Sequence, residues 1–137
     1  MERAVYLLAW ALVKGLQALP LAWVARLGRA AGALAYHLDR RHRRMAQLNL
    51  ETALGPDVPP DRIRSIAREH FRRLGENYCS AVKTASMSST ELAPHLEVTG
   101  TEIIMNRLRP LTSAVVAIGH FGNFELYART GSGFAGM

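Results

Sequence analysis

Residues 4–25 form a long apolar stretch that contains a single charged residue, Lys14. A membrane-spanning helix needs about 20 mostly apolar residues, so length alone permits spanning. Lys14 would then lie near the middle of the bilayer at a cost of about 2.5–3.5 kcal/mol, and Gln17 and Pro20 add to that cost. No small-residue cleavage site follows a compact apolar run, so the stretch is not expected to be a secretory signal.

The polar side chains of this first segment fall on one narrow side of a helix. At about 100° per residue they occupy an arc of roughly 80°, and the remaining faces are almost wholly apolar. Cations and amphipathic aromatic rings in such a stripe suit the interface between lipid and water. We therefore expect a membrane-contacting stripe, with an interfacial and a spanning helix both open, made of Arg3, Tyr6, Trp10, Lys14 and Gln17.

A second helix is expected to begin at Pro20 and to continue through residues 21–37. Gly28 and Gly32 in this helix permit close packing against another helix. The helical projection separates an apolar side from a more polar side, as expected of an amphipathic, membrane-associating helix. The apolar side contains Val24, Leu27, Ala31, Leu34 and Leu38, and the opposite side contains Arg26, Arg29, Tyr36 and Arg40.

The densest positive run of the chain follows directly, at residues 39–44, and contains Arg40, Arg41, Arg43 and Arg44. The chain holds 17 Lys and Arg against 11 Asp and Glu, a formal net charge of +6. Basic residues beside apolar helices are attracted to anionic lipid, by about 1 kcal/mol each. Two other interpretations are a solvated helix face and a nucleic-acid arm, but an arm would not need adjacent Leu- and Trp-rich helices. Membrane attraction is therefore the favoured interpretation.

The middle of the chain predicts a boundary between two helical patterns, followed by a long helix. Residues 55–61 are rich in turn formers, and Asp61 can cap a helix that runs to about Ala85. His70 falls on the apolar side of this helix and is interpreted as structural, and Cys79 is interpreted as a small buried residue. A single cysteine cannot form an internal disulfide, so a reducing compartment is favoured. The apolar side contains Ile63, Ile66, Ala67, His70, Phe71, Leu74, Tyr78 and Val82.

The last third of the chain predicts an α/β arrangement. Residues 95–99 alternate like a short strand, residues 101–108 form a helical stretch that Pro110 ends, and residues 113–118 are a continuous apolar run typical of a buried strand. Strand, helix and strand indicate the opening βαβ unit of an α/β fold. We therefore expect a membrane-associating helical region at 1–54, a core helix at 61–88, and the start of an α/β catalytic domain at 95–137.

The candidate chemistry lies directly after the predicted buried strand, in the sequence HFGNFE. Open α/β sheets bind their ligands at the carboxyl ends of strands. His120 can act there as a general base, with Glu125 fixing its tautomer and stabilising the imidazolium. Because residues five apart lie roughly 140° apart on a helix, the two can meet only through a turn, which Gly122 and Asn123 permit. The alternative is that His120 only caps helix amides.

The HFGNFE segment resembles the H-x4-D/E catalytic block of the lysophospholipid acyltransferase superfamily, most of all its lipid A biosynthesis (lauroyl/myristoyl) branch. The resemblance covers nearly the whole chain, and its specificity lies in the combination of blocks. These other similar blocks are Leu19-Pro20-Leu21, Leu27-Gly28 with Gly32, Tyr36 with the Arg40–Arg44 run, Asn49-Leu50, Ala67-Arg68-Glu69-His70-Phe71 and Leu74-Gly75.

The resemblance implies an O-acyltransferase without a cofactor or metal. His120 would deprotonate a hydroxyl of a glycolipid such as a lipid A precursor, or of a lysophospholipid, and Glu125 would orient His120. Gly122 and Asn123 would contact substrate, and the donor would be an acyl-carrier-protein or coenzyme A thioester. The expected location is the cytoplasmic face of the bacterial inner membrane, on an anionic surface and without nucleic acid.

Two further hypotheses remain beside this one. Family members are typically much longer, and the blocks that follow the H-x4-E motif are absent, so a fragment of such an enzyme is expected. A non-catalytic peripheral membrane module with a structural His120 is one alternative. A small basic nucleic-acid-binding protein is the other, suggested by an isoelectric point near 10.2.

Overall fold

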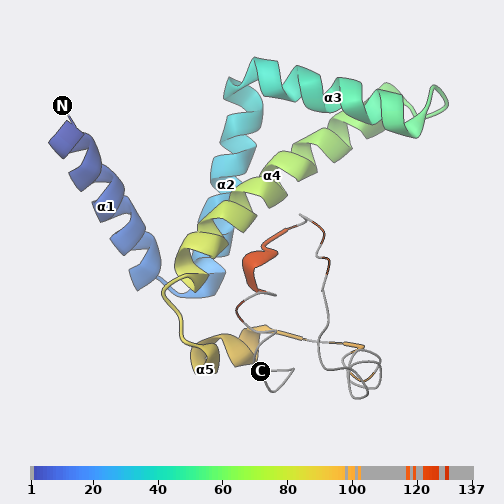
Figure 1. Ribbon diagram of the computed structural model, residues 1–137. Coiled ribbons are helices and arrows are strands. Elements are labelled where there is room, and N and C mark those ends of the chain that lie inside the picture. The colour runs from blue at the N-terminus through green and yellow to red at the C-terminus, as the bar shows by residue number, and fades with distance from the viewer. Residues whose placement is uncertain are drawn as a thin grey trace. The chain divides into compact units, whose positions relative to one another are not determined.

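The computed structural model describes residues 2–97, 99–100, 102, 117, 119, 122–126 and 129. The chain divides into two compact units, Met1–Ser86 and Met87–Met137. The first unit contains α1 (Glu2–Ala18), α2 (Leu21–Leu38), α3 (Arg40–Leu54) and α4 (Pro60–Thr84), shown from blue to yellow-green in Figure 1. The second unit contains α5 (Ser89–Leu92) and the 3-10 helix η1 (Ala93–His95).

Short connections separate the helices of the first unit, and local residue chemistry explains them. Pro20 has the extended backbone that precedes α2, so the predicted helix start at this proline is confirmed. Asp39 lies between α2 and α3, and its carboxylate accepts a hydrogen bond from the His42 amide at 3.0 Å, which caps α3. Gly55 ends α3 with φ at 84°, in the left-handed region that glycine adopts most readily. The turn-rich residues 55–59 therefore connect α3 to α4.

The closest contact in the first unit is between the backbones of α2 and α4. A Cβ built on Gly32 would lie 2.1 Å from the Phe71 carbonyl oxygen, and one built on Gly28 would lie 2.5 Å from the Gly75 carbonyl oxygen. From the other helix, a Cβ on Gly75 would lie 2.2 Å from the Gly28 carbonyl oxygen. Any larger residue would push the two backbones apart. The prediction that Gly28 and Gly32 permit close helix packing is thus confirmed.

The buried side chains surround this glycine contact. Val24 is fully buried on α2, and Ile63 and Ala67 are buried on α4. Tyr36 and Phe71 meet edge to face, with ring centroids 5.5 Å apart, a geometry that aromatic pairs prefer. Full burial of one such large side chain stabilises a fold by roughly 1.5–3 kcal/mol. The fold of the first unit is therefore held mainly by α2 against α4.

The apolar side of α2, as the helical projection defines it, is largely exposed. Leu27, Leu34 and Leu38 are 48%, 59% and 72% exposed, whereas Tyr36, which was assigned to the polar side, is buried. The physical reason is the close backbone approach, because glycines must face the partner helix and they define the buried side. Large apolar residues on the other side of α2 are then left largely exposed.

Two expectations for α4 also need correction. His70 is exposed rather than part of the core face, and Tyr78 is 68% exposed. Cys79 is half-buried. The N-cap of α4 is Pro59, with Pro60 as the first helical residue, so Asp61 does not cap the helix but forms an ion pair with Arg64 one turn on. A proline at the first helical position needs no amide partner, which makes a side-chain cap dispensable there.

The predicted α/β fold class is wrong, because the structure is mainly helical and its described residues contain no strand. The Ser88 capping box with Glu91 starts α5, and Pro94 continues the chain into η1, where a strand had been expected from His95. Leu96 has extended dihedral angles but no neighbouring strand in the described ranges, and alternation alone cannot supply a pairing partner. Of the predicted helix at 101–108 and strand at 113–118, all but residues 102 and 117 lie outside the described residues.

The sequence permits either a spanning or an interfacial first helix. Among the helices that the structure describes, none is both long enough and apolar enough to cross a bilayer.

Candidate functional site

The arginines of the basic run at residues 39–44 differ in their contacts: one packs against α2, and the other three lie on the surface. Arg43 turns toward α2, where its Nη1 donates to the Tyr36 carbonyl at 2.9 Å and to the His37 carbonyl at 3.3 Å. Its guanidinium also lies 5.4 Å from the centre of the Tyr36 ring. Arg43 therefore satisfies the last carbonyls of α2 and joins α3 to the core, so its role in the fold is structural.

The other three arginines of the run line an open surface groove along α3. Arg40, Arg41 and Arg44 are exposed, and Met45 and Leu48 complete the lining of this groove with both side chains 53% exposed. No carboxylate in the described part of the chain forms an ion pair with these three guanidiniums. We call this feature the arginine groove, and it was predicted only as a run of charge without its two apolar members.

The carboxylate nearest in sequence to the arginine groove is already occupied. Asp39 accepts hydrogen bonds from the His42 amide at 3.0 Å and from its ring Nδ1 at 2.6 Å. These bonds, the amide first, hold the pKa of the Asp39 carboxyl below its ordinary value. Asp39 therefore stays ionised while it caps α3.

The predicted membrane-contacting residues of α1 lie on the surface except Gln17, which is half-buried. Arg3 and Lys14 are exposed, Trp10 is 52% exposed, and α1 contains no buried residue. Its half-buried residues, Val13, Leu16 and Gln17, all lie in its second half. Near that end the Lys83 ammonium donates to the Gln17 carbonyl at 2.6 Å, which joins α1 to the end of α4. The rest of α1 presents large apolar side chains to its surroundings.

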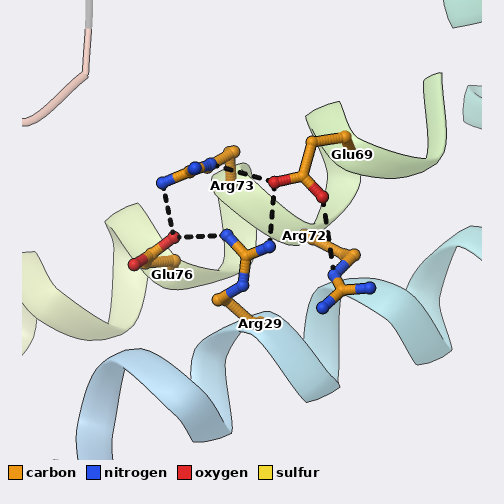
Figure 2. A network of polar contacts seen from close by, with 5 residues as sticks. All are labelled: Arg29, Glu69, Arg72, Arg73 and Glu76. Carbon is orange, nitrogen blue, oxygen red and sulfur yellow. Dashed lines mark hydrogen bonds and ion pairs between the residues drawn. The ribbon is translucent and has the colours of Figure 1, made fainter. Parts of the chain in front are cut away.

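A network of charged side chains links α2 to α4, and the sequence reasoning did not identify it. Arg29 donates from Nη2 to Glu69 at 2.8 Å and from Nη1 to Glu76 at 2.9 Å, and Arg73 bonds the same two carboxylates (Figure 2). Arg29 lowers the pKa of the Glu69 carboxyl and has its own pKa raised in return. The signal in the sequence was the spacing of Glu69, Arg73 and Glu76, which places all three on one side of a helix.

The HFGNFE segment is described only in part. His120 lies outside the described residues, so its distance from Glu125 is also outside them. Gly122 has φ at 62°, which is left-handed backbone, and the Asn123 carbonyl accepts a hydrogen bond from the Leu126 amide at 3.2 Å. Glu125 is exposed and Asn123 is half-buried. Within the described positions, no group of three or more metal-ligating side chains comes together.

Comparison with known proteins gives one match. Residues 1–130 match the family model described as bacterial lipid A biosynthesis acyltransferase. No curated protein and no solved structure matches the chain. The match runs from α1 through α5 and includes the HFGNFE segment, so it covers both the helical unit and the candidate catalytic residues.

Proposed function

The chain belongs to the bacterial lipid A biosynthesis acyltransferase family, and from this membership we propose that it moves a fatty acyl group from a thioester donor to a hydroxyl of a lipid acceptor. Family membership makes the chain an acyltransferase. The donor is proposed to be an acyl-carrier-protein or coenzyme A thioester, and the acceptor a glycolipid such as a lipid A precursor, or a lysophospholipid. The observation that carries the proposal is a match over residues 1–130 that includes His120 and Glu125.

The proposed chemistry is general base catalysis by His120. The imidazole takes the proton of the acceptor hydroxyl, and the oxygen attacks the carbonyl carbon of the thioester. The C–S bond then breaks, an ester forms, and the leaving sulfur receives the proton from the imidazolium. Glu125 orients the ring and stabilises its positive charge, and Gly122 and Asn123 form the turn that brings substrate to the pair.

The proposed location is the cytoplasmic face of the bacterial inner membrane. α1 would lie in the interface with its apolar side chains in lipid, while Arg3 and Lys14 reach the headgroups and Trp10 lies at their level. The support for this orientation is that α1 exposes Leu7, Leu8 and Leu12 at 54%, 72% and 66%. The lipid acceptor resides in the membrane, so an enzyme at the interface meets it there, while a soluble thioester donor reaches it from the aqueous side.

The test is acyl transfer from radiolabelled acyl-carrier-protein thioester, and in parallel from acyl-coenzyme A, to a lipid A precursor. His120→Ala is expected to lower the rate by about 10²–10⁴-fold because the base is lost. Glu125→Gln is expected to lower it less, since the base remains. His70→Ala is the matched control, because His70 is an exposed histidine outside the motif, and it should leave the rate unchanged.

The outcomes separate the proposal from its alternative. Transfer that is lost in His120→Ala and kept in His70→Ala supports the catalytic pair. Equal transfer by the wild-type chain, His120→Ala and His70→Ala contradicts a role for His120. If only the chain extended by its downstream genomic sequence is active, the catalytic pair needs residues beyond these 137. If neither the 137-residue chain nor the extended chain transfers acyl groups but the chain binds vesicles, a non-catalytic membrane module is favoured.

A further inference from the structure

The arginine groove lies on a side of α3 that the fold does not use. Toward the core, α3 presents Arg43, Ala46, Gln47 and Leu50, which are half-buried and spaced like one helical face. Arg41, Arg44, Met45 and Leu48 lie on the opposite side, and Arg40 flanks them. No residue of α3 is buried. This second side of α3, which has two apolar residues beside its cations, is therefore available to a ligand.

The charges of the arginine groove are uncompensated. α3 has no acidic residue in its first turn, and the Asp39 carboxylate is bonded to His42. Positive charge in the first turn of a helix also opposes the helix dipole, so Arg40 and Arg41 weaken α3 rather than stabilise it. Arg29, Arg64 and Arg73 of the same unit, by contrast, each pair with a carboxylate. An anion between the three guanidiniums would remove this repulsion.

The chemistry of the groove specifies the anion. Guanidinium groups bind phosphate through paired hydrogen bonds, and they do so better than ammonium groups. Three cations match a phosphate monoester, which carries close to two negative charges at neutral pH, better than a diester with one. Met45 and Leu48, each 53% exposed beside the cations, would contact an apolar portion of the same molecule. A free ion would leave these two side chains uncovered.

We infer that the arginine groove binds the phosphate monoester headgroup of a membrane lipid, with Met45 and Leu48 against the adjoining apolar part. This deepens the proposed function and rests on it, because the lipid acceptor there is met at a membrane. The ligand is identified by its chemistry alone: a terminal phosphate on an amphiphile.

The experiment measures binding of the 137-residue chain to three kinds of vesicle. They are phosphatidylcholine alone, phosphatidylcholine with phosphatidic acid, and phosphatidylcholine with phosphatidylglycerol added to the same surface charge. The measured quantity is the affinity relative to the neutral vesicles, which removes the apolar contribution of α1. The wild-type chain is expected to prefer phosphatidic acid over phosphatidylglycerol at equal charge.

Two double variants with equal charge identify the site. Arg41→Gln with Arg44→Gln is expected to lower relative affinity for phosphatidic acid vesicles about tenfold or more. Arg62→Gln with Arg64→Gln removes two exposed charges from α4 and should change it by less than about twofold. Arg41→Lys with Arg44→Lys keeps the charge and should recover only part of the loss. Unchanged helicity by circular dichroism verifies that each variant is folded.

Several results would overturn the inference. Equal losses in the two double variants, or equal binding to the two anionic vesicles, would mean general attraction to surface charge. Displacement by inorganic phosphate as effective as that by a soluble short-chain phosphatidic acid would make the ligand a free ion. The His120→Ala variant should bind vesicles like the wild type, so failure of this inference and failure of acyl transfer are separate results.

Discussion

α4 and α1 show that apolar content does not decide which helix is buried. α4 is rich in charged residues, yet it supplies Ile63, Ala67 and Phe71 to the core. α1 is almost wholly apolar, yet it has no fully buried residue. The difference comes from the partner: α4 meets the glycines of α2 at backbone contact, whereas α1 joins α4 mainly near Gln17. The unburied helix is therefore the one available to a membrane, and the charged one carries the fold.

The largest expected effect comes from truncating the aromatic core of α4. Phe71→Ala removes the ring that packs on Tyr36 and should lower the free energy of unfolding by about 3–5 kcal/mol. Leu8→Ala on α1 removes a side chain that is 72% exposed and should change it by less than about 0.5 kcal/mol without lipid. Urea denaturation followed by circular dichroism measures both. A comparable loss in Leu8→Ala would mean that α1 is part of the core.

Glycine-to-alanine substitutions are predicted to change the free energy of unfolding by smaller amounts, and in opposite directions on α2 and α1. Gly32→Ala places a Cβ 2.1 Å from the Phe71 carbonyl oxygen and should destabilise the fold by about 1–3 kcal/mol. Gly15→Ala on α1 meets nothing within 4 Å and should stabilise it by about 0.5–1 kcal/mol, because alanine is the better helix former. The same denaturation assay compares them. Equal signs would contradict the backbone contact between α2 and α4.

The smallest effect is on the pH dependence of stability, and it tests the charged network that links α2 to α4. Because Arg29 lowers the pKa of Glu69 in the folded state, the stability from this pair is present above the ordinary glutamate pKa, about 4.3. It is lost as the pH falls through the lowered value. Glu69→Gln should therefore be less stable than wild type at neutral pH and converge with it in acid. A constant difference at every pH would show that Arg29 does not shift this titration.

Much of the helical unit follows from single residues in the sequence. Pro20, Gly55 and the turn formers after it punctuate the chain locally, and the helix boundaries there were predicted because backbone chemistry acts without a partner. The buried side of α2 could not be predicted in the same way. Burial there is decided by Gly75 and Phe71 on another helix, and a projection of α2 alone ranks Leu34 and Leu38 above Gly28.

The second unit and the candidate site show the same distinction. The alternation at residues 95–99 describes side-chain direction only, while Ser88 and Pro94 supply the local signals that form α5 and η1. The role of Arg43 was hidden among its basic neighbours, because only its contact with the end of α2 separates it from Arg44. His120 and Glu125 remain a prediction from motif and family, with His120 outside the described residues.

The most direct test of the contrast between the two helices is the fluorescence of Trp10 in a Trp23→Phe variant, which leaves one tryptophan in the chain. Adding anionic vesicles should shift the Trp10 emission to shorter wavelengths, because the ring enters the lipid interface. The urea midpoint without lipid should stay close to that of the wild type. An emission unchanged by vesicles at saturating lipid would contradict the claim that α1 is the membrane-contacting helix of this chain.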